Sequence, residues 1–394
     1  MPRLFGENLS QLDIARRSGS LGAFGGVRLM ELSDGQERGV RVLEFRTGTG
    51  LRFTVLVDRA MDICEVEFKG QSIGWHGPSG IRHPGLHEYD SDGGFSWGRS
   101  FSGFLVTCGL DHILGPEVVP ADNYNYPGIK TNAHGLHGRI STIPAKLTGY
   151  GERWEGDRCI LWAEGQVRQA ATFGENLTLF RRIEVDLGSN EIRLSDRVMN
   201  TGFLPTPHMF FYHVNVGAPL LEEGARYLAP ISDVVWSAHV GRYKDQNVGY
   251  QTVPAPMDGF AEQVWQHEAS ADVTGEVPVA LVNDRLVLGV EVTTRKDQLP
   301  CLYEWQHFQA GAYAFGIEPS THHVLGDLAA RERGEMIWLQ GQENRHYDST
   351  FRILDGADEI AATEAQIAAI ARQPVDDYPK PSGHFRPLTG PGRK

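Results

Sequence analysis

The sequence predicts an all-β protein built mostly from antiparallel strands, with a few short helices. The first observation is the pattern of residues 27–75, where short runs of Val, Leu, Phe and Ile alternate with polar residues. These runs break at Asp34-Gly35, Gly48–Gly50 and Lys69-Gly70, which is typical of consecutive strands joined by hairpins. The second observation is the content of 46 glycines and 21 prolines among 394 residues, because such a chain must turn often.

The strand pattern resumes after residue 140. Two amphipathic strands within 177–202 are joined by a turn at Gly188–Asn190, and more strands are expected within 281–295 and 336–354. The segment 76–132 has little periodicity but many aromatic residues. We expect it to be a long irregular segment that packs over one end of the sheets and forms a pocket wall.

Helices are expected only near the two ends of the sequence. Residues 358–372 have an alanine-rich body with acidic residues near the start, and a short helix or arm is expected around Leu12–Arg17. We expect one domain over residues 1–394, with residues 1–25 as an N-terminal arm and 357–394 as a C-terminal helix and tail.

Composition limits the kinds of partner. The formal net charge of −13 argues against nucleic acid or an anionic membrane surface, since both attract basic patches. No signal peptide is recognisable and no apolar run reaches about 18 residues, so we expect no membrane span and a cytoplasmic protein. Scattered cysteines without CxxC spacing predict buried thiols in a reducing compartment. They are Cys64, Cys108, Cys159 and Cys301.

His213 lies in the apolar stretch TPHMFFYHVNVGAPLL, residues 206–221. A histidine near the end of a buried strand can act as a general acid, because small environmental effects move its pKa across pH 7. The alternative is a core histidine whose nitrogens are satisfied by the backbone. His208, five residues earlier, should face the opposite side of a regular strand.

The stretch HGLHGR, residues 134–139, offers further polar groups. Its glycines would let a ligand or another backbone approach closely, and Arg139 provides a fork of donors for hydroxyls or a carboxylate. His134 and His137 stand three residues apart, but the glycines make a helix with a metal-binding pair unlikely to form. The alternative is a turn with ordinary polar histidines.

Glu318 follows an apolar strand and immediately precedes Pro319, so its carboxylate should project at a strand end. Partial burial there would raise its pKa and suit it to act as a base. The alternative is a salt-bridged edge residue. His322 and His323 behind it could line the same cavity or be exposed.

A metal site is a further alternative. His134, His213 and Glu318 could together form a His/Glu cluster that holds a divalent metal. No P-loop, Rossmann glycine pattern, GxSxG or HExxH motif is present, so neither a nucleotide cofactor nor a phosphate cradle is expected.

Several of these stretches together resemble the aldose 1-epimerase (galactose mutarotase-like) superfamily, and most of all its DUF4432 branch. The resemblance covers roughly residues 25–356. It is carried by GVRVLEFRTGTGLRFTVLVDRAMDI, SFSGFLVTCGLDHILG, HGLHGR, HMFFYHVNVGAPLL and YAFGIEPSTH. Ala60 replaces a glycine of the branch's Asp-Arg-Gly-Met-Asp motif, and Gly341-Gln342-Glu343 stands where epimerases have Pro-Gly-Glu.

The resemblance implies a β-supersandwich and three catalytic residues. His137 would contact the sugar, His213 would protonate the ring oxygen, and Glu318 would take the proton of the anomeric hydroxyl. A second group of residues is expected to bind the substrate or support those that do. These residues are His134, Arg139, Asp58, Arg59 and His323.

The resulting prediction is an isomerase of carbohydrate metabolism, an aldose 1-epimerase-like mutarotase that acts on a small sugar without a cofactor. Two alternatives stay open. One is a lyase or isomerase of a modified sugar such as a keto-sugar, with a divalent metal as an option. The other is a non-catalytic carbohydrate-binding protein. The sequence is compatible with a homodimer.

Overall fold

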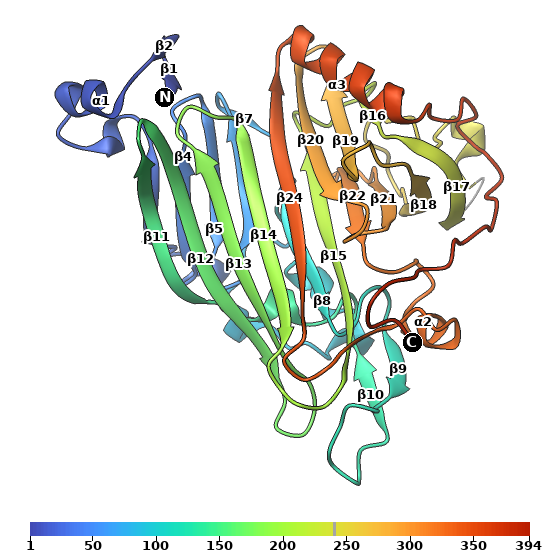
Figure 1. Ribbon diagram of the computed structural model, residues 1–394. Helices are drawn as coiled ribbons and strands as arrows, with labels where there is room; N and C mark the ends of the chain where they lie inside the picture. The colour runs from blue at the N-terminus through green and yellow to red at the C-terminus, as the bar shows by residue number, and fades with distance from the viewer. Residues whose placement is uncertain (239–241) are drawn as a thin grey trace.

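A long antiparallel sheet forms one face of the molecule (Figure 1). The computed structural model describes residues 1–238 and 242–394. Burial alternates along residues 158–170 and 176–186, so this part of the sheet has one face in the core and one facing solvent. In spatial order its strands are β11 (Lys146–Glu155), β12 (Arg158–Ala170), β13 (Asn176–Asp186), β14 (Glu191–Asn200), β24 (Asn344–Asp355), β20 (Leu288–Arg295), β19 (Glu276–Asn283) and β16 (Arg226–Leu228).

A second large sheet contains the strand with His213. Its strands are β17 (Ile231–Ala238), β18 (Gln263–Ala269), β21 (Cys301–His307), β22 (Ala314–Ser320), β15 (Thr206–Gly217) and β23 (Ile337–Leu339), with β8 (Leu105–Leu110) also paired to β15. All twelve residues of β15 are buried. Phe210 and Tyr212 point into the main core, whereas Met209 and Phe211 point into a smaller aromatic cluster. The alternation confirms that His208 and His213 face opposite sides.

The N-terminal strands form a separate sheet joined by hairpins, as the sequence predicts. They are β3 (Gly26–Glu31), β4 (Arg41–Arg46), β5 (Leu51–Leu56), β6 (Asp62–Phe68) and β7 (Gln71–Ser72). Two small ribbons complete the strand set, namely β1 (Arg3–Leu4) with β2 (Glu7–Asn8) and β9 (Glu117–Pro120) with β10 (Thr131–His134). The pairings between these strands are antiparallel, so the predicted fold class is confirmed.

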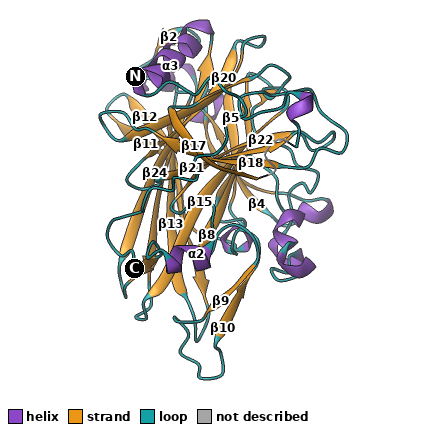
Figure 2. Ribbon diagram, turned by 90° about the vertical axis from the view of Figure 1, so that its right-hand side faces the viewer, coloured by secondary structure: helices purple, strands orange, loops and turns teal. Residues whose placement is uncertain are grey.

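Helices are few and lie outside the strands (Figure 2). They are α1 (Gln11–Arg17), α2 (Asp327–Glu332) and α3 (Ala357–Ile370). The 3-10 turns are η1 (Leu21–Ala23), η2 (Gly35–Glu37), η3 (Pro84–Leu86), η4 (Asp92–Gly94), η5 (Ser96–Arg99), η6 (Ile140–Thr142) and η7 (Lys244–Gln246). The helices expected near 12–17 and 358–372 are both present, and α1 begins with a capping box between Ser10 and Asp13. Among the described residues, no helix has the length and apolar character to cross a membrane.

The expectation of an irregular segment over residues 76–132 is wrong for β8. This strand pairs with β15 from Leu105 to Leu110, and all six of its residues are buried. A strand that is covered on both faces has no polar alternation, so the periodicity that identifies other strands is absent here.

A buried charge network ties the sheets together behind β15. Arg181 on β13 donates to both carboxylate oxygens of Asp196, at 2.9 and 2.6 Å, and to Asp62 on β6 at 3.2 Å. Tyr212 donates to the same Asp196 at 2.7 Å, so the main-core face of β15 is fixed to this network. Removing one member would leave a buried charge unpaired, which costs about 3–5 kcal/mol.

Candidate active site

His213 and Glu318 face each other from neighbouring strands. The β15–β22 register pairs Phe211 with Ser320 and Val214 with Ile317, which sets His213 opposite Glu318. The Nε2 atom of His213 lies 3.0 Å from Oε1 of Glu318, and both side chains are buried. Two titratable groups predicted from separate stretches of sequence therefore form one pair.

Aromatic rings surround this pair. The ring centroids of Phe101, Trp305 and Trp97 lie 4.6, 5.1 and 5.8 Å from that of His213, and we call these three residues the aromatic wall. Burial among them raises the pKa of Glu318 well above its usual range, and the nearby Glu262 carboxylate adds to the rise. Burial also lowers the pKa of His213 to about 3. Burial therefore disfavours the charged form of both groups.

The pair also contains polar atoms without hydrogen-bond partners. Among the described residues, neither Nδ1 of His213 nor Oε1 of Glu318 has one, although Nε2 of His213 lies 3.0 Å from that oxygen. A buried polar atom without a partner costs about 1–3 kcal/mol. Such atoms are expected where a ligand supplies the missing hydrogen bonds.

Gly316 gives the pair its space. It lies two residues before Glu318 on β22, on the same face of the strand. A methyl group at this position would come within 2.9 Å of Oε1 of Glu318 and 3.3 Å of Cε1 of His213. The absence of a side chain therefore lets Glu318 and His213 pack close to the backbone of β22.

His137 lies beside the pair in a turn. Its φ of 59° is left-handed, and its ring centroid is 4.5 Å from Trp97 and 5.8 Å from His213. Its Nδ1 accepts a hydrogen bond from the backbone N–H of Leu114 at 3.3 Å, so the neutral ring carries its proton on Nε2. Burial lowers the pKa of His137 well below its usual value. This geometry suits a fixed hydrogen-bond donor.

His134 and Arg139 flank His137 in sequence but have other neighbours. The ring of His134 stacks on His112, with centroids 4.6 Å apart, and the guanidinium of Arg139 covers the ring of Tyr89 at 4.2 Å. In the described part of the chain, no hydrogen bond, ion pair or ring contact joins either residue to the His213–Glu318 pair. The structure therefore places both outside the immediate site.

Asp58 and Arg59 have structural partners. Asp58 accepts hydrogen bonds from the backbone N–H and Nε of Arg41, at 2.7 and 3.0 Å. Arg59 donates from Nη1 to the carbonyls of Ser100 and Ser102, at 3.2 and 2.7 Å. Ser100 and Ser102 flank Phe101 of the aromatic wall. Arg59 therefore supports the site from behind, while Asp58 anchors the strand next to it.

His323 is held by the C-terminal part of the chain. The side-chain amide of Gln266 donates to its Nδ1 at 2.7 Å, and its Nε2 donates to the carbonyl of Arg386 at 2.8 Å. His322 bonds through Nδ1 to the hydroxyl of Thr321 at 2.8 Å. Both histidines face partners of the protein itself, so the expectation that His323 binds substrate finds no support in its contacts.

The alternative metal site is not assembled. Within residues 1–238 and 242–394, no group of three or more His, Cys, Asp or Glu side chains is arranged to hold a metal ion. The set His134, His213 and Glu318 is divided, because His134 stacks on His112 rather than approaching the pair.

Sequence reasoning missed one residue of the aromatic wall. Trp305 belongs to the aromatic wall, and its indole N–H donates to the Glu262 carboxylate at 3.0 Å. Trp305 lies on β21 directly opposite Gly316. Its alternation with Tyr303 and His307 could have shown which residues share a face, but the neighbouring strand was needed to bring that face to Glu318.

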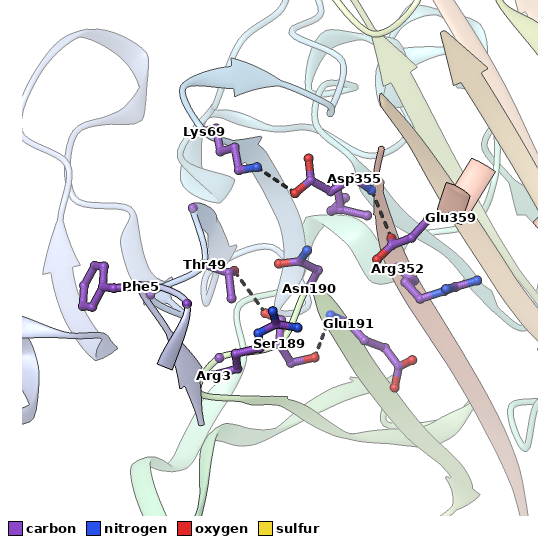
Figure 3. A pocket seen from close by; sticks show the side chains of 15 residues that line it. Arg3, Phe5, Thr49, Lys69, Ser189, Asn190, Glu191, Arg352, Asp355 and Glu359 are labelled. Atoms are coloured by element: carbon purple, nitrogen blue, oxygen red, sulfur yellow. Dashed lines mark hydrogen bonds and ion pairs between the residues drawn. The ribbon is translucent and has the colours of Figure 1, made fainter. Parts of the chain in front are cut away.

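A large cavity lies elsewhere. It measures about 800 Å³ and is formed where the N-terminal arm meets the hairpin ends and the start of α3 (Figure 3). Its lining mixes charges of both signs, for example Lys69 and Asp355, which form an ion pair at 2.7 Å. His137, His213 and Glu318 do not line it. Geometry and chemistry, rather than cavity size, therefore identify the candidate site.

Comparisons with known proteins agree with the fold. A crystal structure from Klebsiella pneumoniae, provisionally described as an aldose 1-epimerase, has 26% identity, covers 91% of each chain and gives a TM-score of 0.79. A galactose mutarotase-like protein from Clostridium acetobutylicum has 13% identity, covers 84% of this chain and 98% of its own, and gives 0.54. A galactose 1-epimerase from Lactobacillus acidophilus has 12% identity, covers 84% and 99%, and gives 0.52.

A comparison with curated protein sequences found no match. The family described as "domain of unknown function (DUF4432)" matches residues 37–353, which is most of the chain. The protein therefore belongs to the DUF4432 family and has the galactose mutarotase-like fold.

Proposed function

We propose that this protein is a carbohydrate-active isomerase, an aldose 1-epimerase-like mutarotase whose acid and base are His213 and Glu318. The observation that carries the proposal is the pair itself. Its two groups lie 3.0 Å apart among aromatic rings, and within the described residues one nitrogen and one oxygen of the pair have no hydrogen-bond partner. Similarity to proteins described as epimerases and mutarotases supports the choice of a sugar as substrate.

In this proposal, ring opening starts from the form of the pair that has its single proton on His213 and Glu318 ionised. With the proton on His213, the Glu318 carboxylate takes the proton of the anomeric hydroxyl while His213 delivers its own to the ring oxygen. The bond between the anomeric carbon and the ring oxygen breaks, and an open-chain aldehyde forms. The pair again holds one proton, now on Glu318. After rotation about the C1–C2 bond, the reverse transfers close the ring in the other anomeric form.

His137 and the aromatic wall would position the sugar. A neutral imidazole with its proton fixed on Nε2 can donate to a sugar oxygen without competing for the transferred proton. Aromatic rings commonly line small-molecule sites and offer an apolar surface to the C–H face of a sugar. In this proposal His137 binds substrate, while proton transfer belongs to His213 and Glu318.

The test is anomer exchange, followed by NMR for a panel of neutral aldoses. Glu318→Gln and His213→Asn should each lower the catalysed rate by about 10²–10⁴-fold, the usual contribution of a positioned acid or base. Glu304→Gln is the matched control. It is the same exchange at another buried glutamate beside a histidine, on the strand that pairs with β22. It should retain activity.

The outcomes separate the alternatives. If the wild-type protein does not accelerate exchange for any aldose in the panel, the mutarotase proposal fails. Sugar binding without conversion would instead indicate a carbohydrate-binding protein, and loss of activity on adding a chelator would indicate a metal-assisted reaction. Loss of activity in Glu304→Gln equal to that in Glu318→Gln, with both proteins folded, would remove the special role given to Glu318.

A further inference from the structure

Two arginines, Arg345 and Arg393, line one cavity at the C-terminal segment, residues 373–394. This segment runs from the end of α3 back along the molecule to the neighbourhood of α2 (Figure 1). Arg393 lies within it, and Arg345 lies near the start of β24. Both are partly buried and line a cavity of about 390 Å³, which is separate from the site around His213.

Neither guanidinium has a carboxylate partner among the described residues. Arg393 donates to the carbonyls of Thr321 and Glu335, at 2.8 and 2.6 Å. Arg345 donates through Nη2 to the carbonyl of Pro391, while its Nε is buried and has no hydrogen-bond partner in the described structure. Carbonyl oxygens satisfy donors, but they do not neutralise two positive charges.

The carboxylates nearest to the cavity are already engaged. Glu335 binds Arg333 at 2.9 Å, and Glu268 binds Lys296 at 3.0 Å. Arg386 reaches Glu268 only at 3.5 Å, with 72% of its side chain exposed. The lining therefore has more positive than negative groups. Its cations are Lys296, Arg345, Arg386 and Arg393, against the acids Glu268 and Asp297.

This local excess contrasts with the whole chain, which has a formal net charge of −13. Burial lowers the pKa of Arg393, and repulsion from Arg345 contributes to the fall. Holding like charges together in a partly dehydrated place opposes folding unless something compensates for them. Structural hydrogen bonds explain the position of Arg393, but they leave Nε of Arg345 unexplained.

We propose that this cavity is a binding site for an oxyanion, a phosphate or carboxylate group of a small molecule. Arginine forks bind both groups through paired N–H donors, and charge-assisted bonds of this kind are the strong ones. The volume of about 390 Å³ lies within the range of small-molecule sites. The free Nε of Arg345 and the loosely held guanidinium of Arg386 provide the donors.

The test measures binding to the full chain by calorimetry and thermal unfolding. Inorganic phosphate and acetate are titrated in separate arms, with sodium chloride at equal ionic strength as reference. We expect saturable binding of at least one of the two anions, with a matching rise in Tm. Arg386→Gln should weaken the Kd at least fivefold, and Arg345→Gln should weaken it more. Arg16→Gln, a change at an exposed arginine of α1, should leave it unaltered.

Comparison of the two arms identifies the group that the site prefers. The proposal is overturned if neither anion gives saturable heat, or if the rise in Tm is the same in wild type, Arg386→Gln and Arg16→Gln. Arg345 is partly buried and donates to the carbonyl of Pro391, so its variant also removes a structural hydrogen bond. Arg386 is exposed, so its variant decides the question on its own.

Discussion

Glu304 and Glu318 lie on paired strands and point to opposite faces of one sheet, each beside a buried histidine. The β21–β22 register places Glu318 opposite Tyr303 and Glu304 opposite Ile317. Burial raises the pKa of both carboxyls well above the usual range. Their hydrogen bonds differ, because Oε2 of Glu304 meets His267 Nε2 at 2.8 Å and Oε1 accepts from Gln306 at 2.7 Å. Only Glu318 keeps a buried oxygen without a hydrogen-bond partner.

The first prediction concerns the stability of these two positions. Glu304→Gln should lower the free energy of unfolding by about 1–3 kcal/mol, because it leaves a formerly paired buried group unsatisfied. Glu318→Gln should change it by less than about 1 kcal/mol, since no hydrogen bond to Oε1 is lost. Urea unfolding of both variants measures the difference. Equal destabilisation would contradict the assignment of Glu304 to structure and Glu318 to chemistry.

The second prediction is the acid limb of the activity profile. In the proposed mechanism the pair works with one proton, and activity falls when His213 takes a second. Because burial lowers the pKa of His213 to about 3, kcat/KM should stay level as the pH falls from 7 to 5. The measurement is enzyme-catalysed anomer exchange after subtraction of the buffer rate. A fall centred near pH 6.5 would show that His213 titrates like an exposed histidine.

The third prediction concerns the tautomer of His137. Nitrogen NMR of the imidazole at pH 7 should show a neutral ring with its proton on Nε2, because Nδ1 accepts from the N–H of Leu114. His137→Gln should reduce kcat/KM by about tenfold, the loss expected for one hydrogen bond of about 1.4 kcal/mol, and leave the pH profile unchanged. A change in the profile would assign His137 to proton transfer.

The fourth prediction concerns acid stability and His208. This ring donates from Nδ1 to the carbonyl of Leu110 and accepts from Tyr347 at Nε2, each at 2.7 Å. Burial lowers its pKa to about 3, so between pH 6.5 and 3 the unfolded chain binds a proton that the folded one does not. Stability should therefore fall with falling pH, by about 1.4 kcal/mol per pH unit from this group.

Urea unfolding between pH 4 and 7 tests that slope. His208→Gln should reduce it, whereas His346→Gln, at an exposed histidine of β24, should not. His213 has a partner whose raised pKa acts in the opposite direction, because Glu318 keeps its proton to a higher pH in the folded chain than in the unfolded chain. Among the described residues, His208 is hydrogen-bonded to a carbonyl and a phenol rather than to a carboxyl, so no paired proton offsets its contribution. An unchanged slope in His208→Gln would contradict the assignment.

The sequence motifs that carry the resemblance led to His137, His213 and Glu318, and the structure brings these three together. These motifs did not distinguish residues that contact the His213–Glu318 pair from residues that support it. Asp58 and Arg59 belong to one motif, but their partners Arg41 and Ser102 depend on strand register and on a distant loop. Neighbours in sequence therefore say little about contacts of this kind.

Other features could not be read from local pattern. Strand β8 has no alternation because it is covered on both faces. Trp305 reaches the site only because β21 pairs with β22, a relationship between strands rather than within one. The positive charges around Arg345 come from residues spread between Lys296 and Arg393. Composition therefore could not predict that they would meet.

Alternate residues of strand β22 face different parts of the protein. Phe315 and Ile317 belong to the main core, whereas Gly316 and Glu318 face the candidate site. Mutational tolerance along this strand should therefore alternate with a period of two. A library that varies only Phe315 and Ile317 should change thermostability. A library that varies only Gly316 and Glu318 should change the turnover of the proposed reaction. Directed evolution could therefore optimise the two sets nearly independently, although both lie within the seven residues of β22.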